Sequence, residues 1–117
     1  MTLAELEHEE VVALLALLGL MARLDGQVSG DEMDLLTRVV SEVGREAFDR
    51  AAKEAAQLPD TEAILKTAGK VLRQEAREVL FEVLYEMAMR EVIVEREAQL
   101  LDWLAETWEL PPRLSAS

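Results

Sequence analysis

The sequence contains one helical pattern twice, and this repeat constrains the fold more than any other feature. Residues 14–22 match residues 80–88 at a spacing of 66. The segments that follow match at a spacing of 65, with Glu32 opposite Glu97, so the second copy is one residue shorter in its turn. A repeat whose length changes only in the turn predicts two similar helix-turn-helix units that share one core.

The apolar residues follow the helical period throughout, which predicts an all-α fold of about six helices. Hydrophobic residues make up 50% of the 117, with only 5 glycines and 3 prolines, as expected of a compact helical chain. This length fits one domain. We therefore expect a single domain over residues 1–117, with repeats at about 11–44 and 76–110 and a short tail at 111–117.

Capping and breaking residues set the expected helix ends. Thr2 and Glu5 have the capping-box spacing, so the first helix is expected to begin there and to end near Leu24. Gly44 is expected to end the second helix, and Asp60 or Thr61 to cap the fourth. The expected helices cover about residues 2–24, 29–43, 46–57 and 94–108, with two more between Pro59 and Arg90 that separate near residues 73–75.

Apolar residues surround the first expected helix on more than one face, which predicts a central and nearly buried helix. The third is rich in alanine, which predicts close packing against a neighbour. The methionines beside the two turns are expected to fill the core beneath them; they are Met21, Met33, Met87 and Met89. Other residues expected to face inward are Leu36, Val40, Val43, Ile64, Leu65, Ala68, Val71 and Leu72.

The charge of the chain limits its partners. With 24 acidic and 12 basic residues the formal net charge is −12, so nucleic acid and anionic lipid are poor direct partners. Cations or another protein fit better. The longest apolar run, residues 11–22, is shorter than the roughly 20 residues of a membrane span, which leaves peripheral association through a partner. Without a signal-peptide pattern or a cysteine, the expected location is the cytoplasm.

The first turn carries the strongest candidate site. Asp25 ends one expected helix, and Asp31 and Glu32 begin the next. Carboxylates that converge from two helix ends are ligands for a hard cation such as Ca²⁺ or Mg²⁺. The alternative is purely structural, because Ser29 and Glu32 have the spacing of a capping box and acidic residues are favoured in a first helical turn. An EF-hand is excluded, because its twelfth position would be Leu36.

The second turn offers Glu91, Glu95 and Glu97. When the two copies are aligned at the spacing of 65, however, Arg90 takes the position of Asp25. A fixed positive charge there discourages a cation. We therefore interpret these glutamates as a solvated face, with Glu97 kept as a further candidate ligand.

Other side chains carry weaker signals. His8, the only histidine, has no partner nearby in the sequence and is expected on the surface. Trp103 lies off the apolar stripe of its helix, which is a hint of an interface. No nucleophile stands beside a base, so we expect no enzyme activity.

The first repeat resembles the TerB-like domains, named for a tellurite resistance protein. Their motif of an A-x-x-D-G helix end, an aliphatic residue and a glutamate is matched here by Ala22, Asp25, Gly26, Val28 and Glu32. The resemblance covers about residues 14–110. It implies an internally duplicated helical module without catalytic activity, linked to tellurite and other stress responses, whose acidic surface binds a divalent cation.

On that resemblance Asp25 and Glu32 form the first acidic site, and Asp31 and Glu97 are candidates to complete it. In the second copy only Glu97 clearly matches, so a symmetric pair of sites is not expected. The alternative is a metal-free domain that docks a basic or apolar partner.

Overall fold

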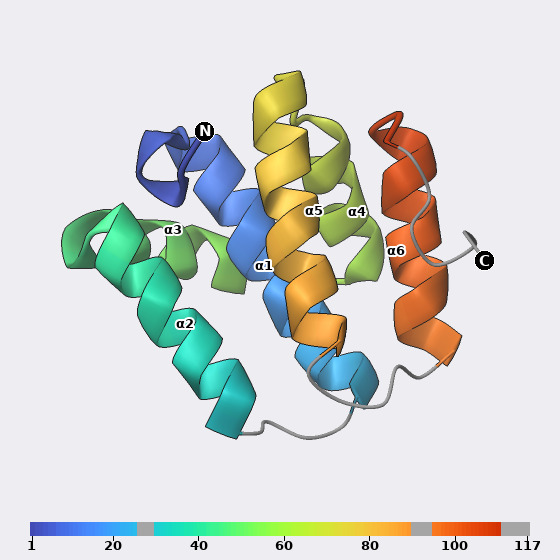
Figure 1. Cartoon of the computed structure of the whole chain (residues 1–117), viewed down its shortest axis with the longest axis horizontal. Helices are drawn as coiled ribbons and strands as arrows, with labels where there is room; N and C mark the ends of the chain where they lie inside the picture. Colours follow the sequence, from blue (N-terminus) through green and yellow to red (C-terminus); the bar gives the residue numbers. More distant parts are fainter. Residues whose placement is uncertain (26–29, 90–94, 111–117) are drawn as a thin grey trace.

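The computed structural model describes residues 1–25, 30–89 and 95–110, except for the side chains of residues 24, 25 and 30–32. These residues contain no strand, which confirms the all-α prediction (Figure 1). The elements are η1 (Leu3–Glu5), α1 (His8–Asp25), α2 (Gly30–Val43), α3 (Arg45–Ala56), α4 (Thr61–Gly69), α5 (Gln74–Met89) and α6 (Glu95–Thr107).

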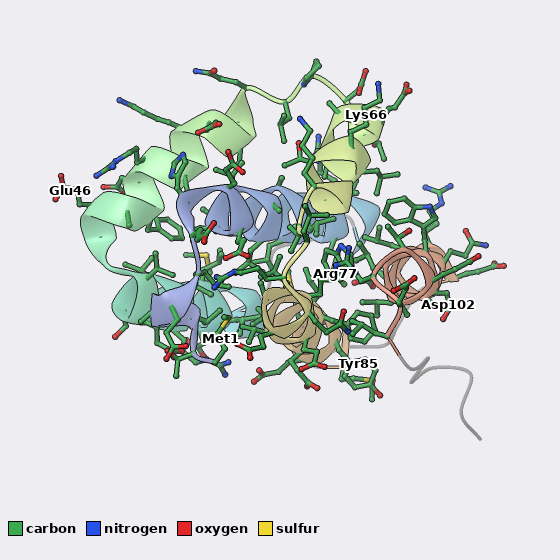
Figure 2. All side chains as sticks on the ribbon, turned by 90° about the horizontal axis from the view of Figure 1, so that it is seen from above. Met1, Glu46, Lys66, Arg77, Tyr85 and Asp102 are labelled. Carbon is green, nitrogen blue, oxygen red and sulfur yellow. The ribbon has the colours of Figure 1, made fainter. Side chains whose placement is uncertain are left out.

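Helix α1 is the centre of the molecule, as its sequence predicted. It packs against α3, α4, α5 and α6. Figure 2 shows α3 and α4 on one side of α1, with α2, α5 and α6 on the other. Between residues 11 and 21 only Leu15 and Gly19 are not buried. The buried residues of α1 are Glu10, Val11, Val12, Ala13, Leu14, Ala16, Leu17, Leu18, Leu20 and Met21.

The predicted start of the first helix is wrong. Thr2 makes no capping hydrogen bond with its side chain, and only Leu3–Glu5 form a short 3₁₀ turn before α1 begins at His8. Leu3 is buried in the core, and Leu6 has an extended backbone. Burial of Leu3 therefore replaces the first turns of the expected helix with a separate anchor.

The other predicted helix ends agree with the structure. The backbone N–H of Ala63 donates to the Asp60 carboxylate at 2.9 Å, so Asp60 caps α4. Gly44 follows α2 with a φ of 99°, a conformation that favours glycine. The break between the fourth and fifth helices lies at residues 70–73, close to the expected position.

Three of the residues expected to face inward are exposed. They are Met33 and Met89, beside the turns, and Leu72, whose exposed fraction is 76%. Helix α2 buries Leu35 and Val39 instead, a face shifted from the expected one. Leu72 lies beyond the end of α4 at Gly69, where the helical period no longer applies.

The close packing predicted for α3 is confirmed by its contact with α1. Ala51 is fully buried in a cluster with Val11 and Val12 of α1. Ala55 also packs against the core, and together with Ala52 and Ala56 it lines a hollow between α3 and α1. Small side chains thus bring the helices together at one point and leave space at another.

The repeat matches positions that are buried in both copies. The two lead helices begin 66 residues apart, at His8 and Gln74. Each residue of the following matched pairs is buried: Leu14 and Leu80, Leu17 and Val83, Leu18 and Leu84, and Met21 and Met87. The repeat in the sequence is therefore a repeat of core positions.

Candidate functional site

The helix ends that flank the two predicted acidic turns lie at the same end of the molecule. Helices α1 and α5 end there, and α2 and α6 begin there (Figure 1). We call these four helix ends the acidic end. Helix C-termini carry partial negative charge, which favours a cation, and helix N-termini favour carboxylates.

Only part of the predicted site can be located. Asp25 is the last residue of α1, and Asp31 and Glu32 follow Gly30 at the start of α2. The side chains of these three residues lie outside the described residues, as do residues 26–29 and 90–94 with Glu91. Over the described part of the chain, no group of three or more acidic or histidine side chains is arranged to hold a metal ion. The four-residue metal site stays a prediction.

Glu97 is not part of a solvated face, contrary to the expectation for the second turn. It lies in the first turn of α6 and is only 5% exposed, whereas Glu95 is exposed as expected. Leu100 and Leu101 follow it at helical spacing and are both buried. Glu97 therefore points to the core side of α6, where a carboxylate must be compensated by hydrogen bonds or by opposite charge.

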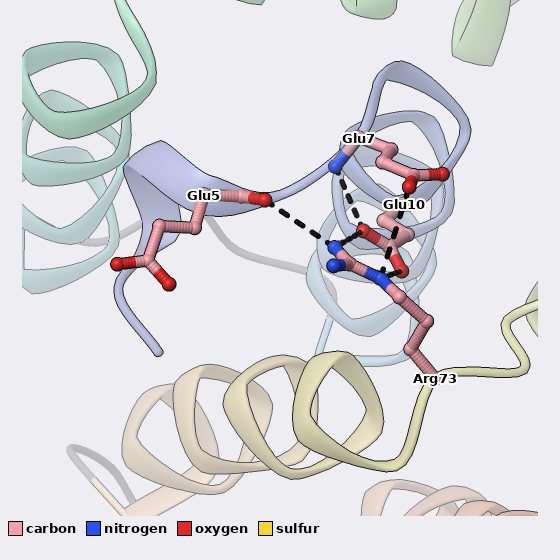
Figure 3. Close-up of polar contacts among 4 residues, drawn as sticks. All are labelled: Glu5, Glu7, Glu10 and Arg73. Carbon is pink, nitrogen blue, oxygen red and sulfur yellow. Dashed lines mark hydrogen bonds and ion pairs between the residues drawn. The ribbon is translucent and has the colours of Figure 1, made fainter.

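A second buried carboxylate, Glu10, lies near the other end of α1. Figure 3 shows the Arg73 guanidinium against it: Nε donates to Oε2 at 2.9 Å, and Nη2 donates to Oε1 at 2.5 Å. The backbone N–H of Glu7 also donates to Oε1 at 2.7 Å. Arg73 Nη2 further donates to the carbonyl oxygen of Glu5 at 3.3 Å. This cluster ties the start of α1 to the connection between α4 and α5.

The chemistry of the Glu10–Arg73 cluster fits a structural role. The hydrogen bonds from Arg73 lower the pKa of Glu10, against the opposing effect of burial, and the Glu7 N–H lowers it further. The same contact raises the pKa of Arg73. Glu10 thus stays ionised at neutral pH with its oxygens occupied, which makes it a poor general base. Sequence reasoning missed this pair, because its members are 63 residues apart.

His8 has a partner that its neighbours in the sequence did not suggest. It lies on the surface as expected, but its Nε2 is 2.6 Å from Oε2 of Glu54 on α3. Both side chains are well exposed. The prediction of a surface histidine is right, and its partner is 46 residues away in the sequence, so the sequence near His8 gave no sign of it.

Trp103 is 38% exposed, while Leu101, Leu104 and Trp108 of the same C-terminal region are buried. It borders a shallow hollow of about 400 Å³. The described residues around this hollow are Leu20, Thr61, Leu65, Arg96, Gln99, Leu100 and Trp103. Its partial exposure agrees with the prediction from its place off the apolar stripe.

Comparison with protein families matches residues 11–117 to the family described as tellurite resistance protein TerB. The match covers α1 from Val11 onward and all later helices. No curated protein and no solved structure gives a significant match. Among the described helices, none combines the length and the apolar character that crossing a membrane requires. The match spans nearly the whole chain, and the chain therefore belongs to the TerB family of tellurite resistance proteins.

Proposed function

We propose that this chain is a cytoplasmic, non-enzymatic TerB-family module whose acidic end binds a divalent cation, Ca²⁺ or Mg²⁺, and thereby controls contact with a partner protein. The family links such a module to tellurite resistance. The observation that supports the cation best is the gathering of four helix ends at one end of the molecule, with Glu97 buried in the first turn of α6 (Figure 1).

The number of ligands that a cation needs explains why the gathering of four helix ends at the acidic end matters. Ca²⁺ takes about six to eight oxygen ligands, more than one turn supplies. Asp25 at the end of α1, Asp31 and Glu32 at the start of α2, and Glu97 on α6 come from three helix ends. Backbone carbonyl groups at the ends of α1 and α5 offer further oxygens. A cation there would offset part of the net charge of −12.

The proposal is tested by calorimetric titration of the full chain with Ca²⁺, Mg²⁺, Mn²⁺ and Zn²⁺. We expect saturable binding of at least one ion, weakened by Asp25→Asn and by Glu97→Gln. Glu95→Gln is the matched control, because Glu95 lies on the same turn of α6 but is exposed. Lack of binding for all four ions, or equal weakening by the Glu95 control, would contradict the proposal.

Asp25→Asn is included because Glu97→Gln alters a buried side chain and can lower stability by itself. Thermal melts of each variant in chelator identify that effect. A variant that is as stable as the wild type and binds the ion less tightly supports the site. A destabilised variant with unchanged affinity assigns its residue to packing alone.

A metal-free interaction module is the second candidate, favoured by Trp103 beside its hollow with Leu20 and Leu65. A partly exposed tryptophan next to apolar side chains is typical of a binding hot spot. If this candidate holds, Trp103→Ala abolishes binding of a partner purified with the wild-type chain, and chelator has no effect on that binding. Leu72→Ala is the control, because Leu72 is exposed in the connection between α4 and α5.

A further inference from the structure

A hollow of about 440 Å³ lies between α1 and α3 and is separate from the Glu10–Arg73 cluster. We call it the α1–α3 hollow. The described residues around it are Leu15, Ala16, Leu18, Gly19, Ala22 and Arg23 of α1, Leu36 of α2, Phe48, Ala52, Ala55 and Ala56 of α3, Leu58, Ile64 of α4 and Met87 of α5. Its volume and its apolar walls are those of small-molecule sites, which span about 300 to 1,000 Å³.

Small side chains on both walls keep the hollow open. Gly19 lies in the middle of α1, where glycine is among the least favourable residues for a helix. Close packing does not require it, because a Cβ added at Gly19 would meet no heavy atom within 4 Å. The opposite wall is lined by Ala52, Ala55 and Ala56. Larger side chains at these positions would fill the space.

One positively charged side chain borders the α1–α3 hollow. Arg23 is the only charged residue among the described lining, and it forms no ion pair with any described carboxylate. It follows Leu15 and Gly19 at spacings of four, so the three residues share one stripe of α1. By contrast Arg38, Arg45, Arg50 and Arg73 each face a glutamate or aspartate. Arg77 and Arg96 also form no ion pair with a described carboxylate, but Arg77 donates to backbone carbonyl groups and Arg96 borders the hollow at Trp103, so Arg23 is the unpaired arginine at this hollow.

We propose that the α1–α3 hollow binds a fatty-acid-like monocarboxylate. Its aliphatic chain lies against the leucine and alanine walls, and its carboxylate accepts hydrogen bonds from the Arg23 guanidinium. Arginine binds carboxylates through two parallel N–H groups, which gives geometric selectivity. The hollow supplies the apolar burial, and Arg23 selects the charge of the head group.

The net charge of −12 includes Asp25, two residues after Arg23, whereas most of the other acidic residues are distant from Arg23 in the sequence. Exposed charges beyond about 8 Å are largely screened at physiological ionic strength. The overall charge therefore slows the approach of an anion more than it weakens the contact with Arg23. A neutral apolar ligand would leave the guanidinium unused, and a cationic amphiphile would be repelled by it.

The test is calorimetric titration of the full chain with decanoate, decanol and decyltrimethylammonium, each below the concentration at which it forms micelles. All titrations contain chelator, so that binding is independent of the divalent cation proposed above. We expect decanoate to bind about three- to ten-fold more tightly than decanol, and decyltrimethylammonium to bind most weakly. Equal affinities for the three, or no binding of decanoate, would overturn the proposal.

Variants separate the two halves of the site. Gly19→Leu and Ala52→Leu fill the hollow from opposite walls and should each weaken decanoate binding about ten-fold or more. Gly19→Ala is the matched control, since it adds a single methyl group to open space and should bind decanoate nearly as the wild type does. Loss of binding in Gly19→Ala, or full binding in both filling variants, would overturn the assignment of the site.

Arg23→Gln removes the charge and should weaken decanoate about three- to ten-fold, while leaving decanol unchanged. Arg96→Gln is the control for net charge, because Arg96 is also an exposed arginine but borders the hollow at Trp103. Equal weakening by both substitutions would overturn the role of Arg23. Sedimentation that shows a wild-type dimer broken by Gly19→Leu would assign the hollow to a second copy of the chain instead.

Discussion

Helices α1 and α5 share one face and differ on another. Their matched core positions are buried in both helices, yet Val12, Ala16 and Leu20 of α1 stand opposite glutamates at the spacing of 66. The glutamates of α5 are Glu78, Glu82 and Glu86. One stripe is thus apolar and buried in the first helix but acidic in the second.

The two helices between the repeats explain this difference. Val12 packs in a cluster with Ala51 of α3, and Leu20 shares a hollow with Leu65 of α4. On α5, Glu86 instead pairs with Arg38 of α2 at 3.1 Å on a partly exposed surface. A repeated sequence therefore fixes the shared core face, while the neighbours added between the copies decide whether the next face is apolar or charged.

Exchanging residues between α1 and α5 on the stripe that differs should change the free energy of unfolding most. Val12→Glu places a carboxylate at a buried position that packs in a cluster with Val11 and Ala51. It should lower the free energy of unfolding by about 3 kcal/mol or more, because an unpaired charge is costly to bury. The reverse exchange, Glu78→Val, lies on an exposed position and should change it by less than about 0.5 kcal/mol. Similar losses in urea melts of the two variants would break the comparison.

Substitutions on the shared buried face should lower the free energy of unfolding by similar amounts in α1 and α5. Leu18→Ala and Leu84→Ala remove matched buried leucines and should each lower the free energy of unfolding by about 2 to 5 kcal/mol. The loss should be near the upper value for Leu84→Ala and near the lower value for Leu18→Ala, because Leu18 already borders the α1–α3 hollow. Chemical denaturation measures both, and two losses below about 0.5 kcal/mol would refute the shared core face.

The first turns of the two helices differ in how they bury a matched position. Glu10 of α1 stands opposite Ala76 of α5, and both are buried. Glu10→Gln should lower stability at neutral pH by about 1 to 2 kcal/mol, less than for a fully buried pair, because Arg73 is partly exposed.

The pH dependence follows from the lowered pKa of Glu10. Stabilisation by this pair is fully present above the ordinary glutamate pKa of about 4.3, and it is lost as the pH falls through the lower pKa of the folded state. Urea melts over an acidic pH series should therefore show a flatter loss of stability for Glu10→Gln than for the wild type. Glu62→Gln, at an exposed glutamate of α4, should keep the wild-type slope. Parallel slopes for all three proteins would contradict the pair.

The smallest effect is expected at the first residue of each helix. His8→Gln gives α1 the residue that begins α5. It removes an exposed contact with Glu54, so the free energy of unfolding should change by less than about 0.5 kcal/mol. A larger loss in the same melts would show that the contact between α1 and α3 at this point holds the fold.

Local sequence signals predicted most of the helices but few of the long-range contacts. The helical period located the buried face of α5, and Asp60 marked the start of α4. Sequence reasoning failed at the start of α1, because the burial of Leu3 depends on how it docks in the core. The inward face of α2 was shifted because its neighbours, not its own period, choose which stripe is buried.

In the candidate site too, features set by local sequence could be predicted, and features set by long-range packing could not. The pairing of Glu10 with Arg73 could not be predicted, because the residues meet only through the packing of α1 against the segment before α5. The burial of Glu97 could have been predicted, since Leu100 and Leu101 lie on its face of α6. The α1–α3 hollow had a signal in Gly19 and the alanines of α3, but small residues also permit close packing, as Ala51 shows.

The most direct test of the proposed cation site is a set of thermal melts of the wild type and Glu32→Gln, in chelator and in a millimolar divalent cation. If Glu32 belongs to a cation-binding group of carboxylates, the substitution relieves repulsion, so Tm in chelator rises. The same substitution reduces the gain in Tm that the cation gives. If Glu32 serves only a capping box with Ser29, glutamine preserves the cap. Identical melting behaviour of the two proteins under both conditions would contradict the cation site.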